Sequence, residues 1–288
     1  MIKLIASDMD GTLLNETSQV SKENAAAIRY AQEQGIEFMV ATGRGRTEAS
    51  PVLAKAGLSL PMISVNGAQV YDQAGQIMFT IDIPKELVLQ VITVLEKHQL
   101  YFELATTKGT FSNSHAMRIA TTSNYLKEAR NISRKMAIAM AAAHLELLHV
   151  HFVPDFASIL ADENLQILKF IVFALDDPGL LAVATDELNK LPHLTVTSSA
   201  KNNIEINHVN AQKGRALKRV AELKDIPLDE VMAIGDNFND LSMLEVAGVS
   251  FAMANGPEAV HAYAKYLAPA NSENGVAQAI HRAINENL

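Results

Sequence analysis

Residues 3–12 read Lys-Leu-Ile-Ala-Ser-Asp-Met-Asp-Gly-Thr, an apolar run that ends in two acids and a glycine. Short apolar runs bounded by turn residues are typical of strands buried inside a sheet. We therefore predict a buried strand over residues 3–7, with Asp8 directly at its carboxyl end and Asp10 two positions further along.

The same rhythm of short strand and helix continues outward from this segment and returns late in the chain. Strands are predicted at 37–42, 62–65, 230–234 and 249–253, and helices at 21–34, 47–56, 214–224, 240–247 and 276–285. Short apolar strands that alternate with helices favour a parallel sheet covered on both faces.

Between these two parts the pattern changes to longer helices and paired strands. A hairpin is expected around residues 200–202, and a long helical segment over 116–148. The predicted fold class is therefore α/β: a Rossmann-like parallel-sheet core of residues 1–83 and 208–288, with an α+β domain of residues 84–207 inserted into it.

The composition excludes several classes of function. The 288 residues are 49% hydrophobic and 19% charged, which is an ordinary globular balance, and the net charge of −8 disfavours binding to nucleic acid or an anionic membrane. The chain has no cysteine, so disulfides, thiolate–zinc sites and cysteine nucleophiles are ruled out. We expect a soluble cytoplasmic protein with no membrane span and no obligate protein partner.

Polar clusters follow four of the predicted core strands. They are residues 8–12, 42–44, 66–67 and 235–240. Because the carboxyl ends of parallel strands open on one crevice, these clusters are expected to meet there. Asn66-Gly67 alone favours an ordinary turn, whereas two acid-rich clusters at matching strand ends indicate a site.

Phosphoryl transfer is the chemistry that suits these residues. Asp8, Asp10 and Asp236 are hard oxygen ligands that suit Mg²⁺, and no His or Cys accompanies them to favour zinc. Asp8 is the better candidate for a nucleophile that forms an aspartyl-phosphate. Asp10 can protonate the leaving oxygen and later activate water.

Three further side chains could bind the phosphate. Lys213 precedes a predicted core helix and would neutralise the phosphate as a point charge. Thr42 and Asn239 could supply neutral hydrogen bonds to phosphate oxygens.

The four clusters together resemble a known family. Asp-Met-Asp-Gly-Thr-Leu-Leu at residues 8–14 resembles the first motif of the haloacid dehalogenase superfamily of phosphatases. Residues 41–44 resemble the second motif, residues 212–217 the third and residues 235–240 the fourth. An insertion between the second and third motifs resembles the C2 cap type, and Arg44 with residues 64–68 is typical of the Cof-type subgroup.

The resemblance implies a role for each matching residue. It makes Asp8 the nucleophile and a magnesium ligand, Asp10 the acid/base and a ligand through its backbone carbonyl, and Asp236 the third protein ligand. Phosphate is then held by the backbone at Met9, by Thr42 with Gly43, and by Lys213 and Asn239. Asp240 is expected to orient these groups rather than to bind the metal.

The leading hypothesis is a Mg²⁺-dependent phosphomonoesterase that acts on small soluble phosphorylated metabolites. The alternative is a phosphotransferase similar to phosphohexose mutases, which would use cationic residues of the insertion for a second phosphate: Arg118, Arg130, Arg134, Lys135 and Lys169. A non-catalytic phosphate sensor is disfavoured because it has no need of both Asp8 and Asp10.

The sequence leaves the substrate open among sugar phosphates, pyridoxal phosphate and flavin-pathway phosphates. His149 and His151 are expected to be surface or packing residues, and Lys201, Asn202 and Asn203 to form an ordinary hairpin turn.

Overall fold

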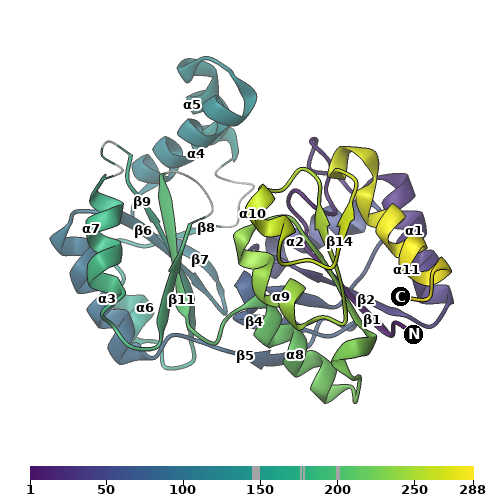
Figure 1. The fold of residues 1–288 in the computed structure, drawn as a ribbon. Coiled ribbons are helices and arrows are strands. Elements are labelled where there is room, and N and C mark those ends of the chain that lie inside the picture. Colours follow the sequence, from purple (N-terminus) through teal and green to yellow (C-terminus); the bar gives the residue numbers. More distant parts are fainter. Residues whose placement is uncertain (145–149, 176, 178, 199–201) are drawn as a thin grey trace. The chain divides into compact units, whose positions relative to one another are not determined.

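A computed structural model describes the chain except for residues 145–149, 176, 178 and 199–201. It divides the chain into two compact units, drawn in Figure 1. Residues 1–81 and 210–288 form one, here called the core unit, and residues 82–209 form the other, here called the inserted unit. The boundaries expected from the sequence, after residue 83 and before residue 208, differ from these by two residues each.

The core unit is built on an eight-stranded sheet. Its strands follow the order β14 (Tyr266–Ala268), β13 (Val249–Met253), β12 (Val231–Gly235), β1 (Leu4–Ser7), β2 (Glu37–Ala41), β3 (Met62–Ser64), β4 (Gln69–Tyr71) and β5 (Ile77–Thr80). The first six pair in parallel, as predicted, while β4 and β5 add an antiparallel hairpin that the sequence pattern did not indicate.

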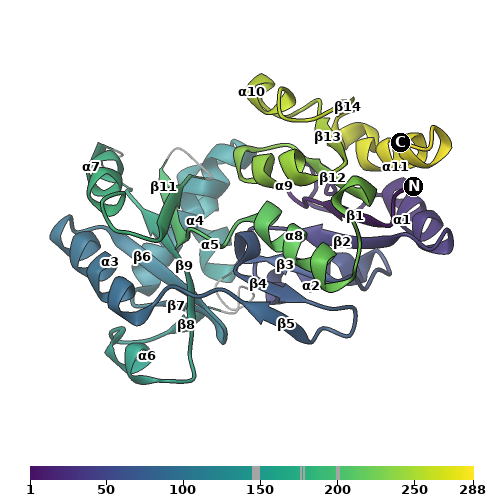
Figure 2. The same cartoon turned by 60° about the horizontal axis from the view of Figure 1, so that its bottom comes forward.

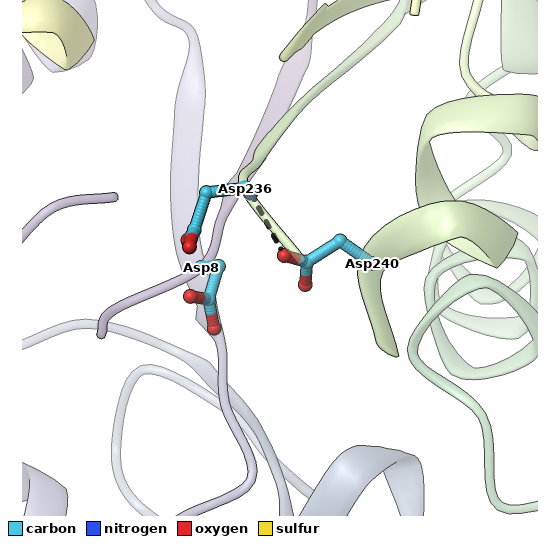
Figure 3. A group of neighbouring side chains, drawn as sticks. All are labelled: Asp8, Asp236 and Asp240. Carbon is cyan, nitrogen blue, oxygen red and sulfur yellow. Dashed lines mark hydrogen bonds between the residues drawn. The ribbon is translucent and has the colours of Figure 1, made fainter. Parts of the chain in front are cut away.

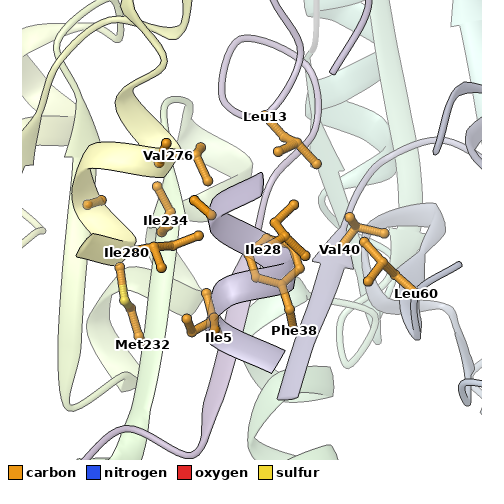
Figure 4. Close-up of a cluster of buried hydrophobic side chains, with 14 of the residues drawn as sticks. Ile5, Leu13, Ile28, Phe38, Val40, Leu60, Met232, Ile234, Val276 and Ile280 are labelled. Carbon is orange, nitrogen blue, oxygen red and sulfur yellow. The ribbon is translucent and has the colours of Figure 1, made fainter. Parts of the chain in front are cut away.

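Helices cover both faces of this sheet because its strands are apolar on both sides. Ile5 of β1 packs with α1 (Lys22–Glu33), α2 (Arg46–Lys55) and α11 (Gly275–Asn285), in the cluster of Figure 4. Leu4 and Ala6 face α8 (Lys213–Leu223), α9 (Leu241–Val246) and α10 (Glu258–His261) instead. Figure 2 shows α1 and α11 side by side and α8 near α9. Short 3₁₀ turns lie at Val65–Gly67, Leu228–Glu230, Phe238–Asp240 and Asn271–Glu273.

The inserted unit has its own six-stranded sheet. The strand order is β10 (Leu194–Thr197), β11 (Asn203–His208), β9 (Ile167–Phe173), β6 (Tyr101–Thr106), β7 (Gly109–Ser112) and β8 (Val150–Phe152). The strands pair antiparallel except for β7 with β8, which are parallel. Its helices are α3 (Lys85–Lys97), α4 (His115–Arg130), α5 (Arg134–His144), α6 (Ala157–Ala161) and α7 (Gly179–Leu188).

The two faces of the inserted sheet differ in chemistry. One face packs apolar residues such as Phe102, Phe170 and Ile206 against α3 and α7. The alternate positions of the same strands carry buried charges, which form ion pairs with one another and with Arg118 of α4. Arg118 contacts Glu103 at 2.8 Å and Lys169 contacts Glu205 at 3.0 Å. We call these four residues the inserted-sheet charge cluster.

Some residues singled out from the sequence have ordinary surroundings here. The ring of His151 on β8 lies 5.0 Å from that of Phe111, and Asn203 belongs to β11 rather than to the hairpin turn. His149 and Lys201 lie outside the described residues. Among the helices that the structure describes, none has the length and apolar content needed to cross a membrane.

Candidate active site

Asp8 stands at the centre of the core sheet. It is the first residue after β1, which pairs with β2 on one side and β12 on the other. Its backbone N–H donates to the carbonyl of Ile234 at 2.9 Å, so the hydrogen bonding of the sheet continues through this residue. Only 5% of Asp8 is exposed. Its carboxylate is therefore held on a rigid and largely dry part of the fold.

Three carboxylates converge at this point. Oxygens of Asp8, Asp236 and Asp240 all lie within 4.8 Å of one another (Figure 3). The ammonium of Lys213, at the first position of α8, contacts Asp8 at 2.5 Å and Asp240 at 2.6 Å. The sheet thus brings together residues more than 200 positions apart, as the convergence of strand ends predicted.

Burial and mutual repulsion shift the protonation of this cluster. Burial raises the pKa of Asp8 well above its ordinary value, Lys213 opposes the shift, and Asp240 and Asp236 add to it. Burial likewise raises the pKa of Asp236 to about 6. Burial alone lowers the pKa of Lys213, but the carboxylates of Asp240 and Asp8 more than reverse this effect. At full ionisation the three carboxylates would carry more negative charge than Lys213 balances, and the raised pKa values of Asp8 and Asp236 reflect the cost of that excess.

Asp240 holds Lys213 and the loop after β12 in place. One of its oxygens receives Lys213, and the other accepts the backbone N–H groups of Asp236 at 2.9 Å and Asn237 at 3.0 Å. The dashed line in Figure 3 is the first of these backbone bonds. Because both oxygens are engaged, Asp240 fixes the loop after β12 and the position of Lys213.

Asp236 is oriented by the loop that follows β1. The hydroxyl of Thr12 donates to its carboxylate at 2.6 Å, and both residues are buried. Gly11 lies between them with a φ of +80°, and a Cβ at this position would overlap the Asp236 carboxylate. The glycine is required both by its backbone conformation and by this close approach.

The side chain of Asp10 lies apart from the three acids. It is 54% exposed, and both of its oxygens accept from Arg44, at 2.7 Å from Nε and 2.5 Å from the terminal nitrogen. A two-point guanidinium–carboxylate pair fixes orientation as well as charge. Burial alone lowers the pKa of Arg44, but its bond to Asp10 raises it overall.

The expected phosphate-binding residues surround the same strand ends. Thr42 is buried just after β2, and its hydroxyl accepts a hydrogen bond from the backbone N–H of Arg44 at 3.1 Å. Gly43 lies beside Asn66, whose side-chain oxygen would be 3.1 Å from a Cβ there. The side-chain amide of Asn239 donates to the same oxygen of Asn66 at 3.3 Å.

Any contribution of Met9 to the site must come from its backbone. Its side chain is fully buried in the hydrophobic cluster of Figure 4. Met9 therefore has only its backbone peptide groups available for polar contacts.

The donor set fits a hard divalent cation. Asp8 and Asp236 offer carboxylate oxygens, no thiolate is possible in this chain, and three acids share one ammonium. Oxygen-only sites with one or two carboxylates are typical of Mg²⁺. The excess negative charge is the observation that points to a cation.

Sequence reasoning missed the contacts that orient these groups. Thr12 is part of the first motif, but its hydrogen bond to Asp236 spans 224 positions, and no local sequence pattern indicates it. Asn66 was interpreted as an ordinary turn residue. Its φ of +56° fits that interpretation, yet its side chain also joins Asn239.

Comparison with known proteins gives a consistent result. A sequence model of the haloacid dehalogenase-like hydrolases matches residues 5–280. The phosphatase YwpJ of Bacillus subtilis (strain 168) is 33% identical over 279 residues, which cover 96% of this chain and 98% of that protein. The 5-amino-6-(5-phospho-D-ribitylamino)uracil phosphatase YwtE of the same organism is 32% identical over 278 residues, 96% of each chain.

A solved structure gives the same likeness in three dimensions. It is a haloacid dehalogenase-like hydrolase from B. subtilis, similar with a TM-score of 0.86 and 32% sequence identity. The match covers 97% of this chain and 99% of that one.

Proposed function

The chain belongs to the haloacid dehalogenase-like hydrolase family and is a phosphatase, and from this premise we propose that it hydrolyses phosphate monoesters of small metabolites through an aspartyl-phosphate on Asp8. The observation that carries the proposal is the placement of Asp8: buried, rigid, and in contact with Lys213 beside Asp236 and Asp240. A nucleophilic carboxylate needs such a fixed position and a nearby positive charge.

The reaction has two steps. In the first, an oxygen of Asp8 bonds to phosphorus while the bond from phosphorus to the ester oxygen breaks, and Asp10 gives its proton to that leaving oxygen. In the second, Asp10 takes a proton from a water molecule, whose oxygen attacks the phosphoryl group. This step releases inorganic phosphate and restores the Asp8 carboxylate and the protonated Asp10.

The pair between Asp10 and Arg44 constrains this role. Both oxygens of Asp10 accept hydrogen bonds from Arg44. Protonation of Asp10 would weaken this contact, because it removes the negative charge and turns one oxygen into a hydroxyl, which is a poorer acceptor for the guanidinium. We propose that Asp10 leaves this two-point contact when it acts as the acid.

Mg²⁺ is the proposed cofactor. Asp8, Asp236 and the backbone carbonyl of Asp10 would hold it, and when bound it would neutralise charge on the phosphoryl oxygens. Asp240 is not included among these ligands because both of its oxygens are engaged with Lys213 and backbone N–H groups.

The phosphomutase alternative receives little support from the inserted unit. Two of the cations considered for a second phosphate, Arg118 and Lys169, form ion pairs with Glu103 and Glu205. Each is thus neutralised within its own unit rather than presented to an anion.

We propose that the inserted unit, as a cap domain, selects the leaving group. The named substrate of YwtE carries its phosphate on a ribityl chain, and this supports a phosphorylated sugar or sugar alcohol as the substrate class here.

The substitution Asp8→Asn tests the proposed nucleophile. The amide has the same shape but cannot attack phosphorus, so turnover should fall by at least about 10³-fold while far-UV circular dichroism is unchanged. Acid-quenched wild-type enzyme should carry one phosphoryl group on the peptide that contains Asp8. Substantial phosphate release by the variant would exclude the covalent mechanism.

A further inference from the structure

The loop that follows β1, residues 8–14, is bonded to asparagines from distant parts of the chain. The side-chain amide of Asn255 donates to the carbonyl of Gly11 at 2.8 Å, and that of Asn271 donates to Leu14 at 2.7 Å. Asn24 of α1 donates to Leu13 at 3.1 Å. Three carbonyls of this loop, those of Gly11, Leu13 and Leu14, therefore accept from side-chain amides, and the same loop carries the two proposed catalytic acids.

Asn255 and Asn271 act on the loop as one unit. The backbone N–H of Asn271 donates to the side-chain oxygen of Asn255 at 2.9 Å. Asn255 thus accepts from one partner and donates to the other, and a continuous chain of bonds joins Gly11 to Leu14 through both asparagines. Asn255 lies in the turn after β13, residues 254–256.

The same turn also contacts the loop after β12. A Cβ placed on Gly256 would overlap the backbone carbonyl of Asp236, so this turn and that loop touch directly. The strand order β13–β12–β1 explains the arrangement, because the carboxyl ends of three adjacent parallel strands lie side by side. The turn therefore braces both the loop of Asp10 and the loop of Asp236.

We propose that Asn255 is a positioning residue for Asp10, which acts by fixing the Gly11–Thr12 peptide, one residue further along the loop. The inference rests on the proposed role of Asp10 as the acid. Gly11 has a φ of +80° and no side chain to restrain it, so the hydrogen bond from Asn255 restrains its carbonyl. Small errors in the position of a catalytic group cost large factors in rate.

Asn255 is exposed, which makes the inference testable without unfolding the protein. Water can replace its bond to Gly11, so removal should loosen the loop at little cost in stability. Asn255→Ala removes both bonds. Asn255→Asp keeps an acceptor for Asn271 but no longer donates to Gly11, and is the matched variant.

The experiment compares kcat/KM on an alkyl phosphate and on p-nitrophenyl phosphate, with Mg²⁺ present. Nitrophenolate leaves without a proton, whereas an alkoxide needs one from Asp10. Both variants should therefore lose about 10- to 100-fold on the alkyl phosphate and no more than about threefold on the aryl phosphate. Asn285→Ala, at the exposed end of α11, is the control and should change neither value.

Asp10→Asn separates this inference from the proposed function. If Asp10→Asn itself keeps the wild-type kcat/KM on the alkyl phosphate, Asp10 is not the acid and the proposed function is wrong at that point. If Asp10→Asn shows the leaving-group dependence but the Asn255 variants lower both substrates equally, or neither, the positioning role is refuted. Loss in Asn255→Ala with full activity in Asn255→Asp would also overturn it, because the donor bond to Gly11 would then be dispensable.

Discussion

Two buried groups of charges, one in each unit, differ in how they are balanced. In the core unit, Asp8, Asp236 and Asp240 share the ammonium of Lys213. In the inserted-sheet charge cluster, two glutamates meet two cations, as Glu103 with Arg118 and Glu205 with Lys169. The core group holds three carboxylates and one ammonium, whereas the inserted-sheet charge cluster holds two carboxylates and two cations.

The difference shows which group is built for a ligand. Uncompensated charge in a buried site is costly, and it persists where a ligand supplies the missing charge. The core cluster responds with raised carboxyl pKa values at Asp8 and Asp236. In the inserted-sheet charge cluster, as far as the structure describes it, each glutamate contacts one cation. The first should therefore react strongly to cations and the second should not.

The largest loss of activity is expected when the proposed Mg²⁺ is removed from the core group. Exhaustive chelation should lower phosphate release by about 10³-fold or more, because several kcal/mol of charge stabilisation disappear. Mg²⁺ should restore activity, Mn²⁺ should substitute, and Ca²⁺ should support less, since it prefers more ligands at longer distances. Full activity in the chelated enzyme would remove the metal from the mechanism.

The second-largest loss of activity is expected when the ammonium of Lys213 is removed. Lys213→Ala should lower kcat/KM on every substrate, aryl phosphates included, by about 30- to 1,000-fold, which corresponds to about 2–4 kcal/mol. The reason is that Lys213 contacts Asp8, the proposed nucleophile, at 2.5 Å. A loss confined to one natural substrate would show that Lys213 serves recognition of the leaving group instead.

Asp236→Asn should stabilise the metal-free protein. The pKa of Asp236 is about 6 in the fold, against an ordinary 3.8. Below pH 4 both the folded and the unfolded states hold the proton. Between pH 4 and 6 the unfolded chain releases it first, so the free energy of unfolding falls as pH rises.

The Asn variant lacks this loss of stability. At pH 7 it should be more stable than wild type by on the order of 1–3 kcal/mol, and the gain should vanish near pH 4. Urea unfolding followed by circular dichroism is the measurement, since the chain has no tryptophan. A gain that is the same at pH 4 and pH 7 would contradict the charge argument.

The smallest effect on turnover is expected from the inserted cluster. Lys169→Met with Glu205→Gln removes both charges of one pair, and kcat/KM on p-nitrophenyl phosphate should stay within about twofold of wild type. Lys169→Met alone removes the cation that contacts Glu205 at 3.0 Å and should destabilise the protein by about 3–5 kcal/mol. If the double variant loses as much aryl phosphatase activity as Lys213→Ala, the two clusters are not functionally distinct.

Strand ends were the part of the site that the sequence could predict. Asp8, Thr42 and Asp236 each follow a short apolar run, and parallel strands bring such ends together by geometry alone. Lys213 was predicted from its place at the start of a core helix, and its ion pairs with Asp8 and Asp240 agree with a location among these acids.

Pairings between side chains on separate strands could not be predicted. Lys169 and Glu205 lie in strand interiors, 36 residues apart, and nothing local indicates that each meets the other. The contact of Arg44 with Asp10 is similar, since both residues were recognised but their bond depends on rotamers. The hairpin of β4 and β5 was not predicted, since β4 is three residues long with Val70 as its one aliphatic residue and so presents no apolar run.

The central position of β1 has a consequence for biosynthesis. Leu4 pairs with Glu37 on one side and with Val231 on the other. As the chain leaves the ribosome, β1 and β2 can pair early, but β12 emerges only after the whole inserted unit. Residues 82–209 are contiguous and can fold in that interval. We expect a nascent chain stalled before residue 231 to contain a folded inserted unit and a β1 with one open edge, where Asp8 has not yet met Asp236.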